Sequence, residues 1–154
     1  MKKLLIIVIV LSLPAMVFAE WIHDSSEDLM TGTVSRVALL EADAYRNTIA
    51  APLLIIRYDG SEYDIYVAWR GYSMERGDVT VRLGDSEPRQ WRAALSTDGE
   101  ATFILEWKRF IAAMLDADEM VIQAERATGV MSIARFDLTD FDRALMTLDG
   151  AGDM

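Results

Sequence analysis

The chain contains one histidine, and its neighbours are residue types that hydrolytic enzymes use. His23 is followed by Asp24, Ser25 and Ser26. A serine nucleophile needs a base that is held rigidly against it by the fold, and neighbours in a short polar segment do not provide that arrangement. We therefore predict no catalytic residue, and we interpret His23 as a solvated polar side chain.

Carboxylates are the most abundant groups that could do acid–base chemistry, and two clusters stand out, within residues 59–64 and 116–119. Neither has the fixed odd spacing and central glycine of a calcium-binding loop. We interpret both as turn formers and solubilising surface charge, and predict no metal and no cofactor. A weak calcium site at Asp116–Glu119 and a carboxylate pair for a small envelope hydrolase are the alternatives.

Arginines recur within the strands predicted below. A guanidinium on a strand can bind a carboxylate within the domain or on a partner, so two interpretations stand: internal ion pairs, or anchors of a binding face. Arg57 is the most unusual, because it ends the apolar run Leu53–Ile56. With neighbouring aromatic residues, the candidate partner-binding residues are Arg57, Arg70, Arg82, Tyr66 and Trp21.

Residues 1–19 have the three parts of a secretory signal peptide. Two lysines precede an apolar run that ends at Pro14, and Val17-Phe18-Ala19 forms a cleavage site before Glu20. The apolar run and the cleavage site together are shorter than the roughly 20 apolar residues that a helix needs to span a bilayer. We therefore predict cleavage between Ala19 and Glu20, export to the periplasm and no stable membrane insertion.

Composition narrows the class of partner. Loss of the two leader lysines takes the formal net charge from −10 to −12, and so acidic a chain repels phosphate backbones, which argues against nucleic acid. The chain has no cysteine. It therefore cannot be a lipoprotein or form disulfides, and packing alone must hold it together.

Short strands dominate the rest of the chain. Alternation of apolar and polar residues predicts a strand at residues 63–70, and the turn signal Asp59-Gly60 joins it in a hairpin to residues 53–58. The continuous apolar run at 53–56 is typical of a strand buried on both faces. Further strands are predicted at residues 34–42, 79–83, 91–95, 101–105, 120–127 and 130–136.

Two segments have helical periodicity instead. Apolar residues recur every three or four positions from Trp107 to Leu115, and again from Phe141 to Leu148. We predict that the Thr139 hydroxyl caps the second helix. The expected fold is mainly β: an antiparallel sandwich or partly open barrel of seven to eight short strands with two short helices. The expected organisation is a signal peptide (1–19), an extended lead-in that Trp21 pins to the domain (20–32), one β-rich domain (33–148) and a flexible tail (149–154).

The order of these motifs resembles a known family. A tryptophan after the signal precedes Leu53-Leu54-Ile55-Ile56-Arg57 and Tyr63-Asp64-Ile65-Tyr66-Val67-Ala68-Trp69, and then come Val79-Thr80-Val81-Arg82, Trp91-Arg92 and Ser96-Thr97-Asp98-Gly99. This series resembles the TagO/VasI family of exported proteins associated with type VI secretion systems, with prophage-encoded relatives. The family commonly has a cysteine after the strand arginine, where this chain has Tyr58.

The resemblance implies no catalytic residues. The functional expectation is a non-enzymatic periplasmic accessory protein that binds a protein of the envelope or of a type VI secretion apparatus. The alternatives are the small envelope hydrolase and a prophage-encoded envelope inhibitor or exclusion factor.

Overall fold

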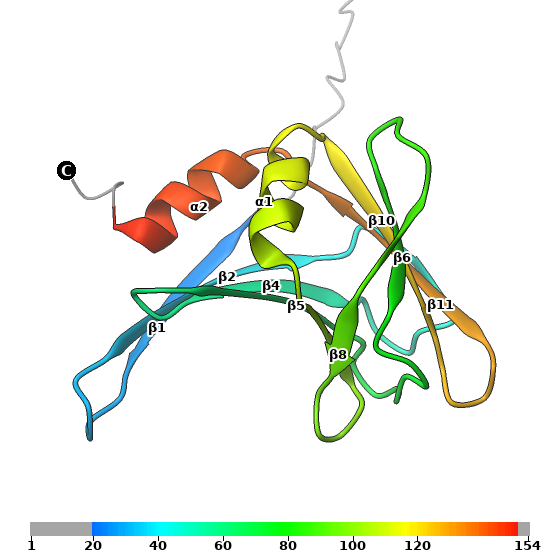
Figure 1. Ribbon diagram of the computed structural model, residues 1–154, viewed down its shortest axis with the longest axis horizontal. Helices are drawn as coiled ribbons and strands as arrows, with labels where there is room; N and C mark the ends of the chain where they lie inside the picture. The colour runs from blue at the N-terminus through cyan, green and yellow to red at the C-terminus, as the bar shows by residue number, and fades with distance from the viewer. Residues whose placement is uncertain (1–19, 151–154) are drawn as a thin grey trace, which may run out of the picture.

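The computed structural model describes residues 20–150, which form two antiparallel β-sheets and two helices (Figure 1). Residues 1–19 and 151–154 lie outside the described range. The expected signal peptide, with Ala19, and most of the expected tail are therefore not described. Among the described residues, no helix is both long enough and apolar enough to cross a membrane.

One sheet has six strands and the other has five. The six-stranded sheet has the order β1 (Ile22–Glu27), β2 (Val34–Glu41), β4 (Leu53–Tyr58), β5 (Tyr63–Ala68), β9 (Ala101–Ile104), β8 (Ala93–Leu95). The five-stranded sheet has the order β3 (Ala44–Arg46), β11 (Met131–Asp137), β10 (Glu119–Glu125), β6 (Val79–Leu83), β7 (Arg89–Trp91). Neither sheet closes into a barrel, so the expected mainly β, sandwich-like architecture is confirmed.

The described chain has eleven strands rather than seven or eight, because the additional ones are short or exposed. All residues of β1 and β3 are exposed, so neither has the apolar alternation by which a strand is recognised. The segment predicted as one strand at residues 91–95 is two strands. It crosses at Arg92 from β7, which pairs with β6, to β8, which pairs with β9.

The core lies between the inner faces of the two sheets and under the helices α1 (Trp107–Leu115) and α2 (Phe141–Asp149). Both helices lie on the same side of the six-stranded sheet (Figure 1). α2 packs over β2 and β4, and α1 packs over β5. The predicted apolar stripe of α2 is confirmed, because its buried residues are Phe141, Ala144, Leu145 and Leu148.

The prediction for the start of α2 is wrong. Asp140 occupies the N-cap position and no side chain caps the helix. The Thr139 hydroxyl instead donates to Asp137 Oδ1 at 2.6 Å, because the chain leaving β11 turns there before the helix begins. At the other end, Gly150 closes the helix with φ 75°, a left-handed conformation that glycine adopts readily.

Candidate functional site

The outer face of the six-stranded sheet carries an apolar row that crosses every strand. The observed pairings place one residue from each strand directly opposite the next. In sheet order the row is Ile22, Leu39, Ile55, Tyr66, Phe103 and Ala94. We call this set the outer row. The helices and the core occupy the opposite face of this sheet (Figure 1).

Exposure varies along the outer row. Ile22 at the edge is 62% exposed, whereas Ile55 near the centre is only 8% exposed. The Tyr66 ring stacks on Phe103 with a centroid separation of 4.4 Å and an interplanar angle of 23°. Ile55 is therefore buried although none of the described elements is layered over that side. Residues 53–56 are expected from the sequence to be buried on both faces of the sheet. For Ile55 on the outer face this is correct, and its neighbours across the strands are Leu39 and Tyr66.

Arg57 lies on the outer face beside the row. It is directly opposite Asp64 across the β4–β5 ladder, and its guanidinium donates to the Asp64 carboxylate from Nε, at 3.1 Å, and from Nη2. The hydrogen bond with Asp64 raises the pKa of Arg57, and burial raises the pKa of the Tyr66 phenol. A fixed cation, a carboxylate and a neutral phenol thus lie together at the centre of this face.

Arg70 lies at one end of the same sheet, in the turn that follows β5. Its backbone has φ 44°, which is uncommon for a residue with a side chain. The guanidinium donates to the carbonyl oxygen of Ala51 at 3.1 Å and lies 3.7 Å from the carboxylate of Glu41 on β2. Arg70 therefore extends the charged margin of the outer face.

Arg82 lies on the other sheet. It projects from β6, pairs with Glu119 of β10 at 3.0 Å and donates to the Gly84 carbonyl oxygen at 2.6 Å. Of the three candidate arginines, the structure therefore brings only Arg57 and Arg70 to one sheet.

The groove between the start of β1 and α2 contains Trp21. The indole Nε1 donates to the Thr139 carbonyl oxygen at 3.1 Å, and the ring packs on Phe141 with a centroid separation of 5.7 Å. These contacts attach the segment before β1 to the start of α2. They account for Trp21 by packing, on the opposite side of the sheet from Tyr66.

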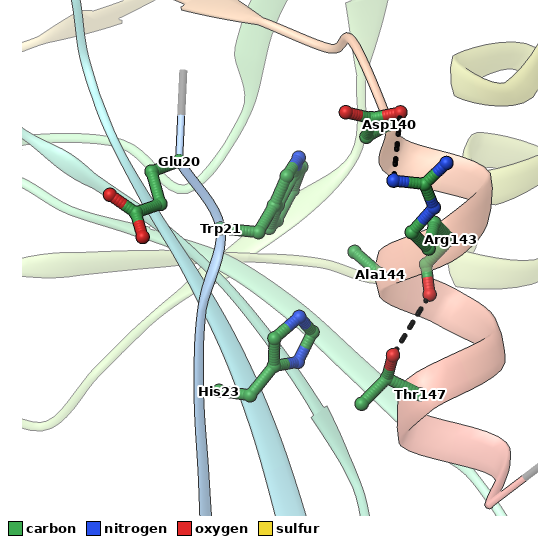
Figure 2. A pocket seen from close by; sticks show the side chains of 7 residues that line it. All are labelled: Glu20, Trp21, His23, Asp140, Arg143, Ala144 and Thr147. Atoms are coloured by element: carbon green, nitrogen blue, oxygen red, sulfur yellow. Dashed lines mark hydrogen bonds and ion pairs between the residues drawn. The ribbon is translucent and has the colours of Figure 1, made fainter. Parts of the chain in front are cut away.

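The same groove, about 560 Å³ in volume, contains the only histidine of the chain. Figure 2 shows Trp21 and His23 pointing toward α2, whereas Glu20 points away from the helix. Arg143 pairs with Asp140 at 3.8 Å, and the Thr147 hydroxyl donates to the helix carbonyl of Arg143. No nucleophile–base pair therefore forms among the residues drawn there.

One or more carboxylates of each acidic cluster have structural partners. Asp59 accepts hydrogen bonds from the backbone N–H groups of Glu62 and Ser61, which lower its pKa to about 2. Asp64 binds Arg57, and Glu119 binds Arg82. Within residues 20–150, no group of three or more histidine, aspartate or glutamate side chains is placed to hold a metal ion.

The sequence prediction missed most of the outer row, namely Ile22, Leu39, Ile55, Phe103 and Ala94. The alternation in residues 63–70 identified Tyr66, but its lateral neighbours depend on the pairing β5–β9–β8, which is not in sequence order. The signal in the sequence that could have revealed the outer row is the presence of apolar residues on the side of several strands that faces away from the core.

Comparisons with known proteins identified no match, whether with family models, curated proteins or solved structures.

Proposed function

We propose that the protein is a non-enzymatic accessory protein of the periplasm. It binds a protein component of the envelope or of a type VI secretion apparatus through the outer face of its six-stranded sheet. The observation that supports this proposal is the outer row: apolar side chains run without interruption across all six strands, on the face opposite the core.

The chemistry of this face suits a protein partner. Interface centres favour aromatic residues and arginine, with charged groups at the margin. Tyr66 and Phe103 provide a stacked aromatic pair near the middle of the sheet, and Arg57 lies beside them with its charge partly satisfied by Asp64. A partner that covers these groups gains apolar burial without leaving an isolated cation buried.

The location rests on the sequence. A charged start, an apolar run and a small residue at position 19 favour export with removal of the leader. The resemblance of the strand motifs to the TagO/VasI family supports a role in the envelope, and it supports binding rather than catalysis.

A comparison of two matched arginine variants tests the proposed face. Arg57→Ala and Arg82→Ala each remove one partly exposed arginine–carboxylate pair, from the six-stranded and the five-stranded sheet respectively. We expect Arg57→Ala and Tyr66→Ala to reduce capture of envelope proteins from a periplasmic extract by tenfold or more. Arg82→Ala should capture the same proteins as the wild type, as identified by mass spectrometry.

Folding of each variant is checked by circular dichroism and thermal unfolding. Loss of capture in Arg82→Ala, with full capture in the folded Arg57→Ala and Tyr66→Ala variants, would place the binding surface on the other sheet. Recovery of the protein only from the cytosol would contradict the periplasmic location.

A further inference from the structure

Among residues 20–150, strand β1 is an open sheet edge, and it is long for this molecule. The two sheets end in four edge strands, and three of these, β3, β7 and β8, have three residues each. β1 has six residues, all exposed, and it pairs with β2 along its whole length without a bulge. Short or bulged edges resist pairing with another chain, whereas a long regular edge is a template for it.

The backbone at the middle of β1 has a donor directed away from β2. The Ser25 N–H donates to Asp24 Oδ1 at 2.8 Å, so it is not used in the ladder with β2. In an antiparallel pair, alternate residues direct their N–H and C=O groups to opposite sides of the strand. Ser25 therefore directs its backbone N–H and C=O groups toward the open edge. In the monomer this N–H donates to the carboxylate of Asp24.

The sequence of β1 favours a second copy of the same strand. Two copies related by a twofold axis perpendicular to the sheet keep matching faces on the same side. One residue must then lie directly opposite its own copy, and we give the position of the axis by that residue. With the axis at Ser25, His23 lies opposite Glu27 of the second copy, and Asp24 lies opposite Ser26 of the second copy. A ring N–H of histidine can donate to a carboxylate on the strand opposite, and no two carboxylates face each other.

The neighbouring registers lack this complementarity. An axis at Asp24 places two aspartates directly opposite each other, and an axis at Ser26 places Asp24 opposite Asp28. An axis at His23 places two histidines opposite each other. For a chain with a net charge of −10, carboxylates in direct opposition would add to the general repulsion between copies.

We propose that β1 pairs antiparallel with β1 of a second copy, with the twofold axis at Ser25, so that the two six-stranded sheets become continuous. This association uses the edge of the sheet and not its outer face, so it is independent of the proposed partner binding. The contact is confined to one strand, and interfaces of such small area are weak and reversible.

A single cysteine tests the register, because the chain has none of its own. Residues at the axis lie about 5.5 Å apart between Cα atoms when they form a hydrogen-bonded pair, a distance that a disulfide spans. We expect Ser25→Cys to form a covalent dimer under mild oxidation. In the control Ser26→Cys, the Cα atoms of the two cysteines would lie about 8 Å apart. This distance is too long for a disulfide, so at least tenfold less dimer is expected.

Sedimentation velocity over a range of concentrations tests the association without a cross-link, using protein purified from cells expressing the full chain. Proline at position 25 removes only the outward N–H, a position that tolerates proline at an edge. We expect Ser25→Pro to lower the dimer fraction at least tenfold, and Asp24→Ala to raise it, because the edge N–H is freed and a charge is lost. A wild type that stays monomeric up to its solubility limit, or equal cross-linking of Ser25→Cys and Ser26→Cys, would overturn the proposal.

Discussion

The hydrogen bond between Trp69 and Thr102 provides the sharpest test of how the core is held together. Trp69 and Thr102 are both fully buried, and the indole Nε1 donates to Thr102 Oγ1 at 3.2 Å. Thr102→Val keeps the shape and the β-branch but leaves the indole N–H unpaired. An unpaired buried donor costs about 1–3 kcal/mol, and the added methyl group offsets part of this. We expect a net loss of about 1–2 kcal/mol in the free energy of unfolding.

A double-mutant cycle separates this hydrogen bond from the loss of packing. Trp69→Phe removes part of a large buried ring and leaves the Thr102 hydroxyl unpaired, so we expect a loss of about 2–4 kcal/mol. The double variant should be more stable than the sum of the two losses predicts, by about 1 kcal/mol. Urea unfolding followed by circular dichroism measures all four proteins. Losses that add within about 0.3 kcal/mol, or a neutral Thr102→Val, would refute the role given to the hydrogen bond.

Three further changes have definite expected outcomes. Gly77→Ala should lower the free energy of unfolding by about 2 kcal/mol or more, because a Cβ there would lie 2.2 Å from the Ala93 carbonyl oxygen. Asp59→Asn should lower the melting temperature at neutral pH, and this difference should shrink as the pH falls below 3.8 and disappear only below about 2, because the folded pKa of Asp59 lies below its unfolded value. Trp21→Phe keeps an aromatic ring but loses the hydrogen bond to the Thr139 carbonyl oxygen, and should speed amide hydrogen exchange in β1.

Each of these predictions has a matched comparison. A Cβ added at Gly129 would meet no atom within 4 Å beyond its chain neighbours, but the backbone there has a φ of +80°. Gly129→Ala should therefore cost about 1 kcal/mol, less than Gly77→Ala. For Asp59→Asn, a difference in melting temperature that does not shrink between pH 3.8 and about 2 would contradict the assigned role of the carboxylate. For Trp21→Phe, exchange in β10 serves as the internal reference, and equal changes in β1 and β10 would indicate global destabilisation.

Local patterns predicted those elements whose two faces differ. Alternation identified β5, the Asp59-Gly60 signal identified the β4–β5 hairpin, and helical spacing identified α1 at Trp107–Leu115. In β5 and α1 the side chains that face the core are apolar at a fixed period, so the periodicity indicates the type of element. β4 is a continuous apolar run, and the turn signal after it indicates the hairpin.

Elements at the margins could not be predicted in this way. β1 and β3 are exposed on both faces, so no apolar period marks them. The alternation through Trp91–Leu95 continues across Arg92, although the chain changes sheets there. A period of two records which side of the backbone is apolar, and it does not record which strand lies alongside.

The same distinction applies to the candidate site. The residue types at Arg57 and Tyr66 pointed to a binding face, but the placement of Arg82 on the other sheet follows only from strand order. The outer row likewise exists only because the register of five successive ladders aligns one residue from each strand.

The amino-acid sequence by itself determined the mainly β class, the two amphipathic helices and the reliance on packing in a chain without cysteine, because these depend on local periodicity and composition. The tertiary structure alone decided which strands are neighbours, which of them form open edges and which side chains share a face. Those features depend on contacts between residues far apart in the chain, and hydrogen bonds between strands are made by backbone groups that every sequence possesses.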